Sequence, residues 1–345
     1  MKKVLLGCLL ALVAALLFVP ATVADEHEDK KISVHGEVRA RWEYLDNYTD
    51  FTDSDDGSFN DSFDFVPYRV RVGVKGEFTK NVSAYIEIQN HGAFGDSYPL
   101  PVAQSPQDPI AQNLRGSYGT NETVLYQGYI DMDEIGGTNL SLKIGRQEHT
   151  LGNELLMGDA DFYNGHSFDG FRATLDYERW DLDVFFYTIA ERNVLPWADE
   201  TDDGPIVNGA SDDAWFTGVT AGFGIGETEQ SLIPYVLYYK DGNGATPVFK
   251  RSFYTIGLLY DRPTGEDNMF DCSAEYAYQM GERGPSYDTD IKASIFEGWF
   301  GVSFGENFRN RFHVGVLATS GQDDSDDSTA FQPLFGDTHQ RAGLA

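Results

Sequence analysis

The amino-acid sequence predicts an all-β protein, an antiparallel up-and-down transmembrane β-barrel. Three observations predict this fold. Apolar and polar residues alternate along thirteen segments, long and short connections alternate between those segments, and the chain begins with an export signal. Together they predict a barrel in the outer membrane of a Gram-negative type of cell.

The first 24 residues have the features of a cleaved signal peptide. Lys2 and Lys3 precede an apolar run over residues 4–19, and small residues continue to Ala24, just before Asp25. A basic start, a short apolar run and a small-residue cleavage site are typical of secretory signals. We therefore expect residues 1–24 to be removed and residues 25–345 to form the barrel.

Hydrophobic periodicity of two begins near residue 32. From position 37 to position 44, every even position is apolar and every odd position is charged. Such alternation indicates strands with two differently solvated faces. Many of the segments have about the 9–11 residues that a tilted membrane strand needs. The thirteen predicted strands are 32–44, 65–79, 81–91, 122–133, 138–147, 167–178, 179–190, 214–224, 231–240, 252–260, 269–280, 290–304 and 309–319.

The connections between these strands alternate in length. Short turns such as 79–81, 224–227 and 305–307 follow the even-numbered strands. Long connections follow the odd-numbered strands: 45–64, 92–121, 148–166, 191–213, 241–251, 281–289 and 320–345. Outer-membrane barrels have short periplasmic turns and long extracellular loops, whereas a soluble β-sandwich has no reason to keep this order. We therefore expect the long connections to lie outside the cell.

Composition excludes several classes of protein. After residue 19 no apolar run approaches the roughly 20 residues of a membrane-spanning helix. The 24 Phe, 19 Tyr and 5 Trp residues argue against intrinsic disorder. A formal net charge of −30 argues against nucleic acid as a partner. Of the two cysteines, Cys8 lies in the leader and Cys272 in a strand, so no disulfide framework is expected.

The cost of burying charge in lipid assigns the strand faces. One Lys or Arg facing lipid at mid-bilayer costs about 2–4 kcal/mol. Four of them, Arg39, Arg41, Arg69 and Arg71, would cost roughly 8–16 kcal/mol, which is as large as the whole stability of about 5–15 kcal/mol that is typical of a domain. The lumen is therefore predicted to contain the basic side chains Arg39, Arg41, Arg69, Arg71, Lys75, Lys143, Arg172 and Arg311. Acidic partners are predicted between them at Glu37, Glu43, Glu77, Glu87 and Asp131.

Aromatic residues near strand ends are expected in the interfacial girdles: Tyr44, Tyr129, Tyr177, Tyr187, Trp180 and Trp299.

Arg146 does not fit the alternation. It shares the parity of Leu140, Leu142 and Ile144, which are expected to face lipid. Either its side chain lies at the rim of the barrel, which we favour, or a β-bulge reverses the alternation there.

Two blocks of sequence resemble a known family. The first runs through LKIGRQE at 142–148, GNELL at 152–156, FYN at 162–164 and SFDGFR at 167–172. The second is FQPLF at 331–335, followed by His339 and by Gly-Leu at 343–344. Both blocks resemble the alginate export family of outer-membrane β-barrels, in which a G-R-Q-E strand end leads through a loop into an S-F-D-G-x-R strand.

The resemblance implies a channel that passes an anionic polysaccharide or oligosaccharide, or another small anion, by passive diffusion without a cofactor. It implies an arginine-rich lumen with a few acidic partners, and it adds Arg146 and Asp169 to the predicted path. Arg172 is a motif position as well. The implied partners are outer-membrane lipid, lipopolysaccharide, the anionic solute and periplasmic export proteins.

The sequence departs from the family pattern in its strand number. Bacterial barrels have an even number of strands, but thirteen are predicted here, and no terminal aromatic strand closes the sequence at residues 343–345. In the family, the second block precedes further strands. We therefore expect the barrel to be incomplete at its C-terminal end.

Three other interpretations remain open. The lumenal charge pairs could serve only to hold a structural or general barrel rigid. The protein could instead be a surface-binding barrel, with loop 92–121 as a binding face or as a plug in the pore. An enzyme at the barrel rim is the third interpretation. His166, Ser167 and Asp169 lie close together in sequence, but nothing identifies a nucleophile, so no catalytic residue is predicted.

No metal site is predicted either. The acidic run at 53–57 does not fit the EF-hand spacing, and the position where that loop needs a Glu is Phe63. The zinc signatures C-x-x-C and H-E-x-x-H are absent from the sequence.

Overall fold

The structure is a computed structural model, and it describes residues 31–45, 63–95, 122–159, 165–190, 214–226, 230–241, 250–263, 269–284, 289–304, 310–322, 327–332 and 334–336. The predicted signal peptide, loop 92–121 beyond residue 95 and most of the other long connections lie outside these residues. In the described part of the chain, no helix has the length and apolarity that crossing a bilayer requires.

One antiparallel sheet contains every strand of the described residues. The strands are β1 (Lys31–Ala40), β2 (Glu43–Leu45), β3 (Phe63–Thr79), β4 (Val82–Gly95), β5 (Glu122–Met132), β6 (Leu140–Gln147), β7 (Phe168–Tyr177), β8 (Trp180–Ala190), β9 (Ala214–Ile225), β10 (Gln230–Asp241), β11 (Arg251–Arg262), β12 (Phe270–Arg283), β13 (Thr289–Phe304) and β14 (Asn310–Thr319). Apart from β2, each strand pairs with its sequence neighbours in the order β1-β3-β4 through to β14. This is the predicted up-and-down arrangement of thirteen strands, with β1 and β2 together forming the first.

The first predicted strand is interrupted opposite a proline. β1 pairs Ala40 with Tyr68 and β2 pairs Glu43 with Phe65, so both follow one register along β3. Between them the Arg41 backbone N–H donates to the Pro67 carbonyl over 3.1 Å. Proline has no N–H to return, so a ladder hydrogen bond is missing at this point and the strand is divided.

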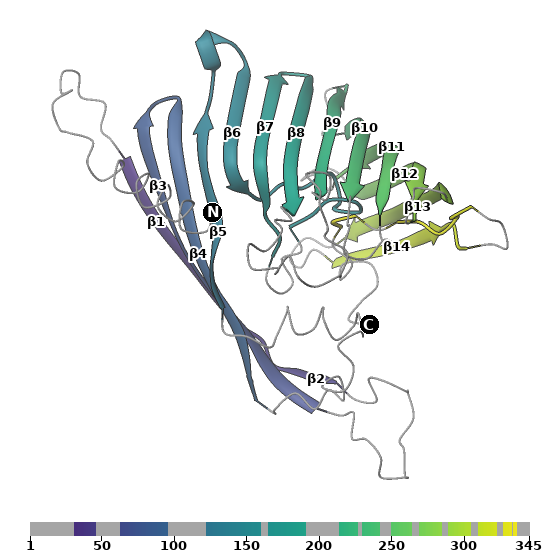
Figure 1. Ribbon diagram of the computed structural model, residues 1–345, viewed down its shortest axis with the longest axis horizontal. Helices are drawn as coiled ribbons and strands as arrows, with labels where there is room; N and C mark the ends of the chain where they lie inside the picture. Colours follow the sequence, from purple (N-terminus) through teal and green to yellow (C-terminus); the bar gives the residue numbers. More distant parts are fainter. Residues whose placement is uncertain are drawn as a thin grey trace, which may run out of the picture.

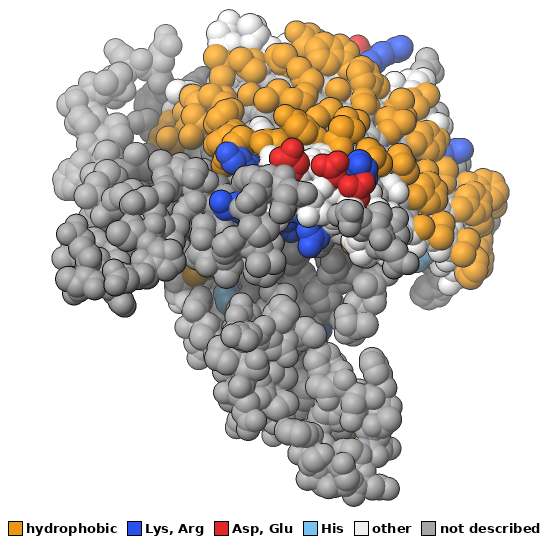
Figure 2. All heavy atoms as spheres, turned by 45° about the vertical axis from the view of Figure 1, so that its right-hand side comes forward, with side chains coloured by type: hydrophobic (Ala, Val, Ile, Leu, Met, Phe, Trp, Pro, Cys, Tyr) orange, Lys and Arg blue, Asp and Glu red, His pale blue; other side chains and the backbone are white. Residues whose placement is uncertain are grey.

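The outer face of the sheet is apolar on every strand of the path from β1 to β14. Exposed apolar side chains, one example from each strand, are Val38, Val72, Ile88, Ile130, Ile144, Phe171, Val184, Val219, Val236, Ile256, Tyr276, Phe296 and Val314. Figure 2 shows hydrophobic side chains covering most of the visible sheet face, with charged groups near its lower margin. In water such a surface would be unfavourable, whereas in a bilayer it forms the lipid-facing band of a transmembrane barrel.

The opposite, inner face supports a compact apolar core. Leu155, Leu156 and Met157 of segment 148–159 pack with inward-facing aromatic residues such as Phe168 and Phe216. Segment 327–336 joins them from the other end of the chain, bringing Phe331, Leu334 and Phe335 against the same cluster. Because this apolar cluster excludes water, it contributes to stability in the same way as the core of a soluble domain.

Segments 148–159 and 327–336 are hydrogen-bonded to each other. Met157 and Phe335 form a parallel β-bridge. The Phe335 N–H donates to the Leu156 carbonyl and the Gly158 N–H donates to the Phe335 carbonyl, each over 2.9 Å. These segments belong to connections 148–166 and 320–345, and they pack against the inner face of the sheet. Their apolar side chains gain more from burial against the inner wall than they would in water.

The sheet curls without closing. Among the described strands, β1 pairs with β3 alone and β14 with β13 alone. Figure 1 shows the strands along one curved wall from β1 to β14, with these two edge strands well apart.

Candidate functional site: the charged inner face

Ion pairs order the arginines of β1 and β3. Arg69 is almost fully buried, and its Nη2 and Nε atoms donate to Glu37 Oε1 over 2.6 and 3.1 Å. Arg39 stands opposite Arg69 in the register. Directly opposed like charges are unfavourable in a sheet, and Glu37 compensates part of this repulsion. At the end of β1, Arg41 Nε donates to Glu43 over 2.6 Å.

Arg71 is held by polar and aromatic contacts. Its Nε donates to Gln89 Oε1 over 2.7 Å, and its guanidinium carbon lies 3.7 Å from the centre of the Tyr126 ring. Glu148 is 3.6 Å from Arg71 Nη1 and also accepts a hydrogen bond from the Tyr126 hydroxyl. Burial raises the pKa of Glu148, while the Tyr126 hydrogen bond and Arg71 oppose that shift. Gln127 links Glu148 to Glu87 through Nε2, over 3.1 and 3.0 Å.

A β-bulge brings Tyr126 and Gln127 to the same carboxylate. The register between β4 and β5 shifts between Glu87 and Ile88, so consecutive residues of β5 both reach Glu148. Strict alternation would have directed one of them to the outer face.

Lys143 and Arg172 lie side by side in the register of β6 and β7. Lys143 Nζ is 3.7 Å from Asp131 and 4.5 Å from the centre of the Tyr129 ring. Arg172 forms an ion pair with Asp183, which is buried and also lies 3.7 Å from His149 Nε2. Both cations therefore face carboxylates of the inner wall.

Lys75 differs from the other basic residues of the inner face. It stands opposite Ser33 on one side and Tyr85 on the other, and among the described residues no ion pair is found for it. Glu77, two positions along β3, stands opposite Lys31 and Ser83. Glu87 is 3.7 Å from His35, and the His35 ring stacks on Tyr85 with the ring centroids 5.3 Å apart.

Arg311 of β14 faces the inner wall as its parity predicts. It forms an ion pair with Asp271, a fully buried residue of β12, and its guanidinium carbon is 5.0 Å from the centre of the Trp299 ring. Seven of the eight basic residues that were assigned by parity thus lie on the inner face of the described strands, and the eighth, Arg41, lies between β1 and β2.

Arg146 and Asp169 occupy a different place. They stand opposite each other in the register of β6 and β7, on the face that also exposes Ile144 and Phe171. Arg146 donates to both Asp169 carboxylate oxygens, over 2.7 and 2.5 Å, and to the Leu125 carbonyl over 3.0 Å. Their assignment to the lumenal path, which came from the family resemblance, is therefore corrected. The pair lies on the outer face one residue from the end of β6, which agrees with the rim position that the alternation favoured.

The predicted aromatic girdle also divides between the two faces. Tyr177 and Trp180 stack on the outer face with ring centroids 4.5 Å apart, and Tyr44 is exposed beside Trp42. In contrast, Tyr129, Tyr187 and Trp299 face inward, where they contact Lys143, His149 and Arg311. The face on which each of these aromatic residues lies therefore follows from its even or odd position in the alternation, and not from its distance to the end of the strand.

Several inner-face charges were missing from the sequence-based assignment. They are the acidic residues Asp181, Asp183, Asp241, Asp261, Asp271, Glu275 and Glu297 and the basic residues Arg251 and Arg283. These residues lie at odd-numbered positions along β8 and β10 to β13. The same alternation that predicted the first lumenal arginines therefore also indicates that they face inward. The cost of a cation in lipid assigns a face to Lys and Arg side chains only, so it left the acidic side chains of the later strands without a predicted face.

The described residues hold no group of three or more His, Cys, Asp or Glu side chains that could bind a metal ion. The inner face can instead offer charge, hydrogen bonds and aromatic surfaces to a solute. Each guanidinium of this face has five N–H groups that can donate hydrogen bonds.

Comparison with known proteins now identifies the family. The profile of the alginate export family matches residues 31–345. This chain belongs to the alginate export family. Membership in the alginate export family, together with the up-and-down sheet, makes the protein an outer-membrane β-barrel with the role of a transport channel. No curated protein matches the chain.

Solved structures that are similar to this alginate export family member are outer-membrane proteins. The OmpF protein of Salmonella typhi, in a complex with daunomycin, is 8% identical with a TM-score of 0.38, covering 84% of this chain and 98% of that chain. The outer-membrane protein OmpT of Vibrio cholerae, in a trimer form, is 8% identical with a TM-score of 0.37, covering 90% and 96%. OccD3 of Pseudomonas aeruginosa is 12% identical with a TM-score of 0.31, covering 80% and 67%.

Proposed function

We propose that this channel passes anionic saccharides or other small anions by passive diffusion. The observation that carries the proposal is the row of cations on the inner face of β1 and β3, formed by Arg39, Arg69, Arg71 and Lys75, with Arg41 just beyond the end of β1. Guanidinium groups suit carboxylate sugars, because they keep their charge and donate in a forked geometry.

Pairing within the wall makes Arg69 and Arg71 weak sites for an anion. Arg69 shares its charge with Glu37, and Arg71 shares its charge with Glu148. A permeating anion then meets several moderate attractions in sequence. Conduction requires such weak, repeated sites, since one tight site would trap the solute. Lys75, which has no ion pair in the described part of the chain, is expected to contribute most strongly to selectivity.

A structural barrel is the second candidate, and the ion pairs themselves favour it. Six of the basic residues predicted to line the lumen have a carboxylate within 4 Å: Arg41, Arg69, Arg71, Lys143, Arg172 and Arg311. Such pairs could rigidify the wall without attracting any solute. A conducting path and a structural barrel predict different results when a cation without an ion pair is neutralised. The anion preference of the channel falls if the cations form a conducting path, and it stays the same if they are only structural.

Reversal potentials across a planar bilayer with a salt gradient test the proposal. The wild-type channel is expected to prefer anions, and Lys75→Gln is expected to lower that preference because it removes an inner-face charge. Lys240→Gln is the matched control, since Lys240 lies on the outer face beside Trp215. A cation-selective wild-type channel contradicts the anion path. Identical selectivity in wild type and Lys75→Gln would leave the cations a structural role.

A further inference from the structure

Glu148 connects segment 148–159 to the row of cations on β3. It is the first residue after β6, and its Oε1 atom lies 3.6 Å from Nη1 of Arg71. The Glu148 side chain is 29% exposed, whereas the Arg71 side chain is only 8% exposed. A guanidinium stays charged. Glu148 is therefore the partner of this ion pair that can exchange a proton with water in the lumen.

The carboxylate of Glu148 is held in this position by β5. Its Oε1 atom accepts a hydrogen bond from the Tyr126 hydroxyl, and its Oε2 atom accepts one from Gln127 Nε2 over 3.1 Å. The backbone N–H of Glu148 donates to Gln127 Oε1 over 3.3 Å. One amide therefore fixes both the side chain and the main chain of Glu148.

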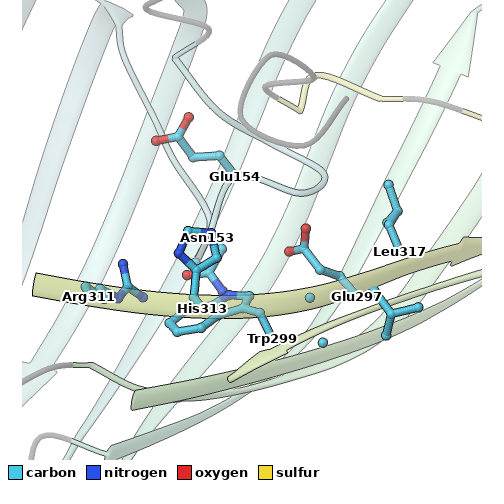
Figure 3. Close-up of a pocket in the computed structure, with 11 residues that line it drawn as sticks. Asn153, Glu154, Glu297, Trp299, Arg311, His313 and Leu317 are labelled. Atoms are coloured by element: carbon cyan, nitrogen blue, oxygen red, sulfur yellow. The ribbon is translucent and has the colours of Figure 1, made fainter. Parts of the chain in front are cut away.

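Segment 148–159 is also held on its far side. Asn153 Nδ2 donates to Ser273 Oγ of β12 over 2.5 Å. Figure 3 shows Asn153 and Glu154 beside β13 and β14, around the pocket that these strands line. The segment is therefore anchored to distant parts of the wall, which keeps Glu148 at a fixed place beside the cations.

Other acidic side chains lie near Glu148. The Nε2 atom of Gln127 donates to Glu87 Oε2 over 3.0 Å as well as to Glu148, so the two carboxylates face one amide. Asp159 adds negative charge from the same segment. Histidine is the residue type whose charge changes near neutral pH, and His35 of β1 lies 3.7 Å from Glu87.

These surroundings favour uptake of a proton by Glu148. Burial raises the pKa of Glu148 above its ordinary value, and the negative charges of Asp159 and Glu87 raise it further. The hydrogen bond from Tyr126 and the charge of Arg71 oppose this shift. Each neighbouring carboxylate makes ionisation of the next one less favourable. Glu148 therefore gains a proton at a higher pH than an exposed glutamate does.

We propose that Glu148 is a specificity-determining residue of the channel, whose carboxylate takes up a proton from lumenal water and thereby strengthens the preference for anions. Each proton adds one unit of positive charge to the wall beside Arg71, whatever else Arg71 contacts. Because Arg71 is buried, the pair acts on a passing ion through its electric field rather than by direct contact. The inference rests on the proposed channel, and it adds control of its selectivity by pH.

Reversal potentials of the full chain in a salt gradient, at about pH 8 and about pH 5, test this proposal, since exposed carboxylates stay mostly charged over that range. The anion-to-cation permeability ratio of the wild type should rise on acidification. At the higher pH, Glu148→Gln should raise the ratio about 2-fold, which is the effect of one unit charge about 8 Å away in water. The rise on acidification should be smaller in Glu148→Gln, and the part that remains comes from histidines such as His35.

Asp169→Asn is the matched control. It also removes a paired carboxylate near the end of β6, but Asp169 lies on the outer face with Arg146. Its permeability ratios should equal those of the wild type at both pH values. An effect as large as that of Glu148→Gln would contradict a local role of Glu148.

Equal ratios in wild type and Glu148→Gln at the higher pH would overturn the proposal, and so would an equal rise on acidification. Circular dichroism verifies that each variant folds. If Glu148→Gln does not fold, Tyr126→Phe carries the test. It removes a hydrogen bond that favours the ionised carboxylate, so the rise in the ratio should occur at a higher pH than in the wild type. An unshifted midpoint would contradict the assignment to Glu148.

Infrared difference spectra between the two pH values separate this proposal from the anion channel, because they need no ion flow. The detergent-folded wild type should gain a protonated-carboxyl band that is weaker in Glu148→Gln. Identical bands in the two proteins would overturn the proton site. A cation-selective wild type in which that band is present would overturn only the anion channel.

Discussion

His149 illustrates how burial sets the charge of a single residue on the inner face. The residue follows β6 and is only 4% exposed. Burial lowers the pKa of His149 strongly, and the nearby cations Arg172 and Lys143 lower it further. The imidazole is therefore neutral at pH 7. Its Nδ1 lies 2.8 Å from the Tyr187 hydroxyl, and its Nε2 lies 3.7 Å from Asp183.

The lowered pKa predicts a pH-dependent stability. In the unfolded chain His149 takes up a proton below about pH 6.5, whereas in the folded chain it stays neutral. The unfolded state then binds more protons, so the free energy of unfolding falls as the pH drops. Between about pH 7 and pH 5, the protonation of His149 in the unfolded chain should lower the free energy of unfolding by about 2 kcal/mol. Urea midpoints measured at both pH values check this.

A pair of variants separates His149 from the other titrating groups. His149→Gln cannot take up the proton, so the drop in its midpoint between the two pH values should be smaller than in the wild type. His313→Gln, which alters an exposed imidazole of β14, should retain the wild-type drop. An equal drop in all three proteins would contradict the assignment to His149.

At the scale of elements, the inward segments determine the shape of the lumen. Leu156 and Met157 are almost fully buried, and the bridge to Phe335 joins the two segments. Much of the inner face of β7 to β13 is therefore covered by an apolar core rather than by water. The inner faces of β1 and β3 contribute no residue to this core, and their charges remain the candidate path.

Truncating this core should destabilise the barrel. Leu156→Ala removes apolar contacts in a closely packed cluster and leaves a cavity, with an expected cost of about 2–5 kcal/mol. Urea titration in lipid vesicles, followed by circular dichroism, measures the change. Ile135→Ala, in the turn η2 (Ile135–Gly137) between β5 and β6, is the control and should cost less than about 1.5 kcal/mol, because Ile135 is only partly buried. Comparable midpoints for the two variants would show that the inward segments do not carry stability.

The sequence predicted the strands well because alternation depends on local chemistry. The predicted strand 138–147 corresponds to β6, and the strand at 214–224 corresponds to β9. The break at Arg41 was not predictable in the same way, because it depends on Pro67, a residue of the next strand. Segments 148–159 and 327–336 lack a period of two, so nothing local indicated that they fold inward. Their place is decided by contacts between residues far apart in the chain, such as Met157 and Phe335.

At the scale of the whole molecule, the inner face has two electrostatic sides. The cations gather on β1 to β7, whereas Asp181, Asp183, Asp241, Asp261, Asp271, Glu275 and Glu297 lie on β8 to β13. Only Arg251, Arg283 and Arg311 stand among these acids on the inner face of the described strands. The formal net charge of −30 therefore cannot be assigned to the outer loops alone.

This asymmetry predicts opposite effects of neutralisation on the two sides. Asp261→Asn preserves the shape of an inner-face side chain and removes one negative charge, so the anion preference should rise. Lys75→Gln should lower it. Both shifts should shrink as the salt concentration increases, because mobile ions screen the wall charges. Reversal potentials at about 0.1 M and 1 M salt measure the signs, and shifts of the same sign in both variants would contradict a divided lumen.

The bridge between Met157 and Phe335 has a consequence for how the chain assembles. One partner follows β6 and the other follows β14, so the contact joins parts of the chain that are separated by β7 to β14. Until it forms, Leu155 and Leu156 lack the cover that Phe331, Leu334 and Phe335 give them in the finished protein. Contacts between such distant parts of a chain form slowly. Completion of the interior is therefore a late event in folding, and the apolar side chains of segment 148–159 are less covered until it occurs.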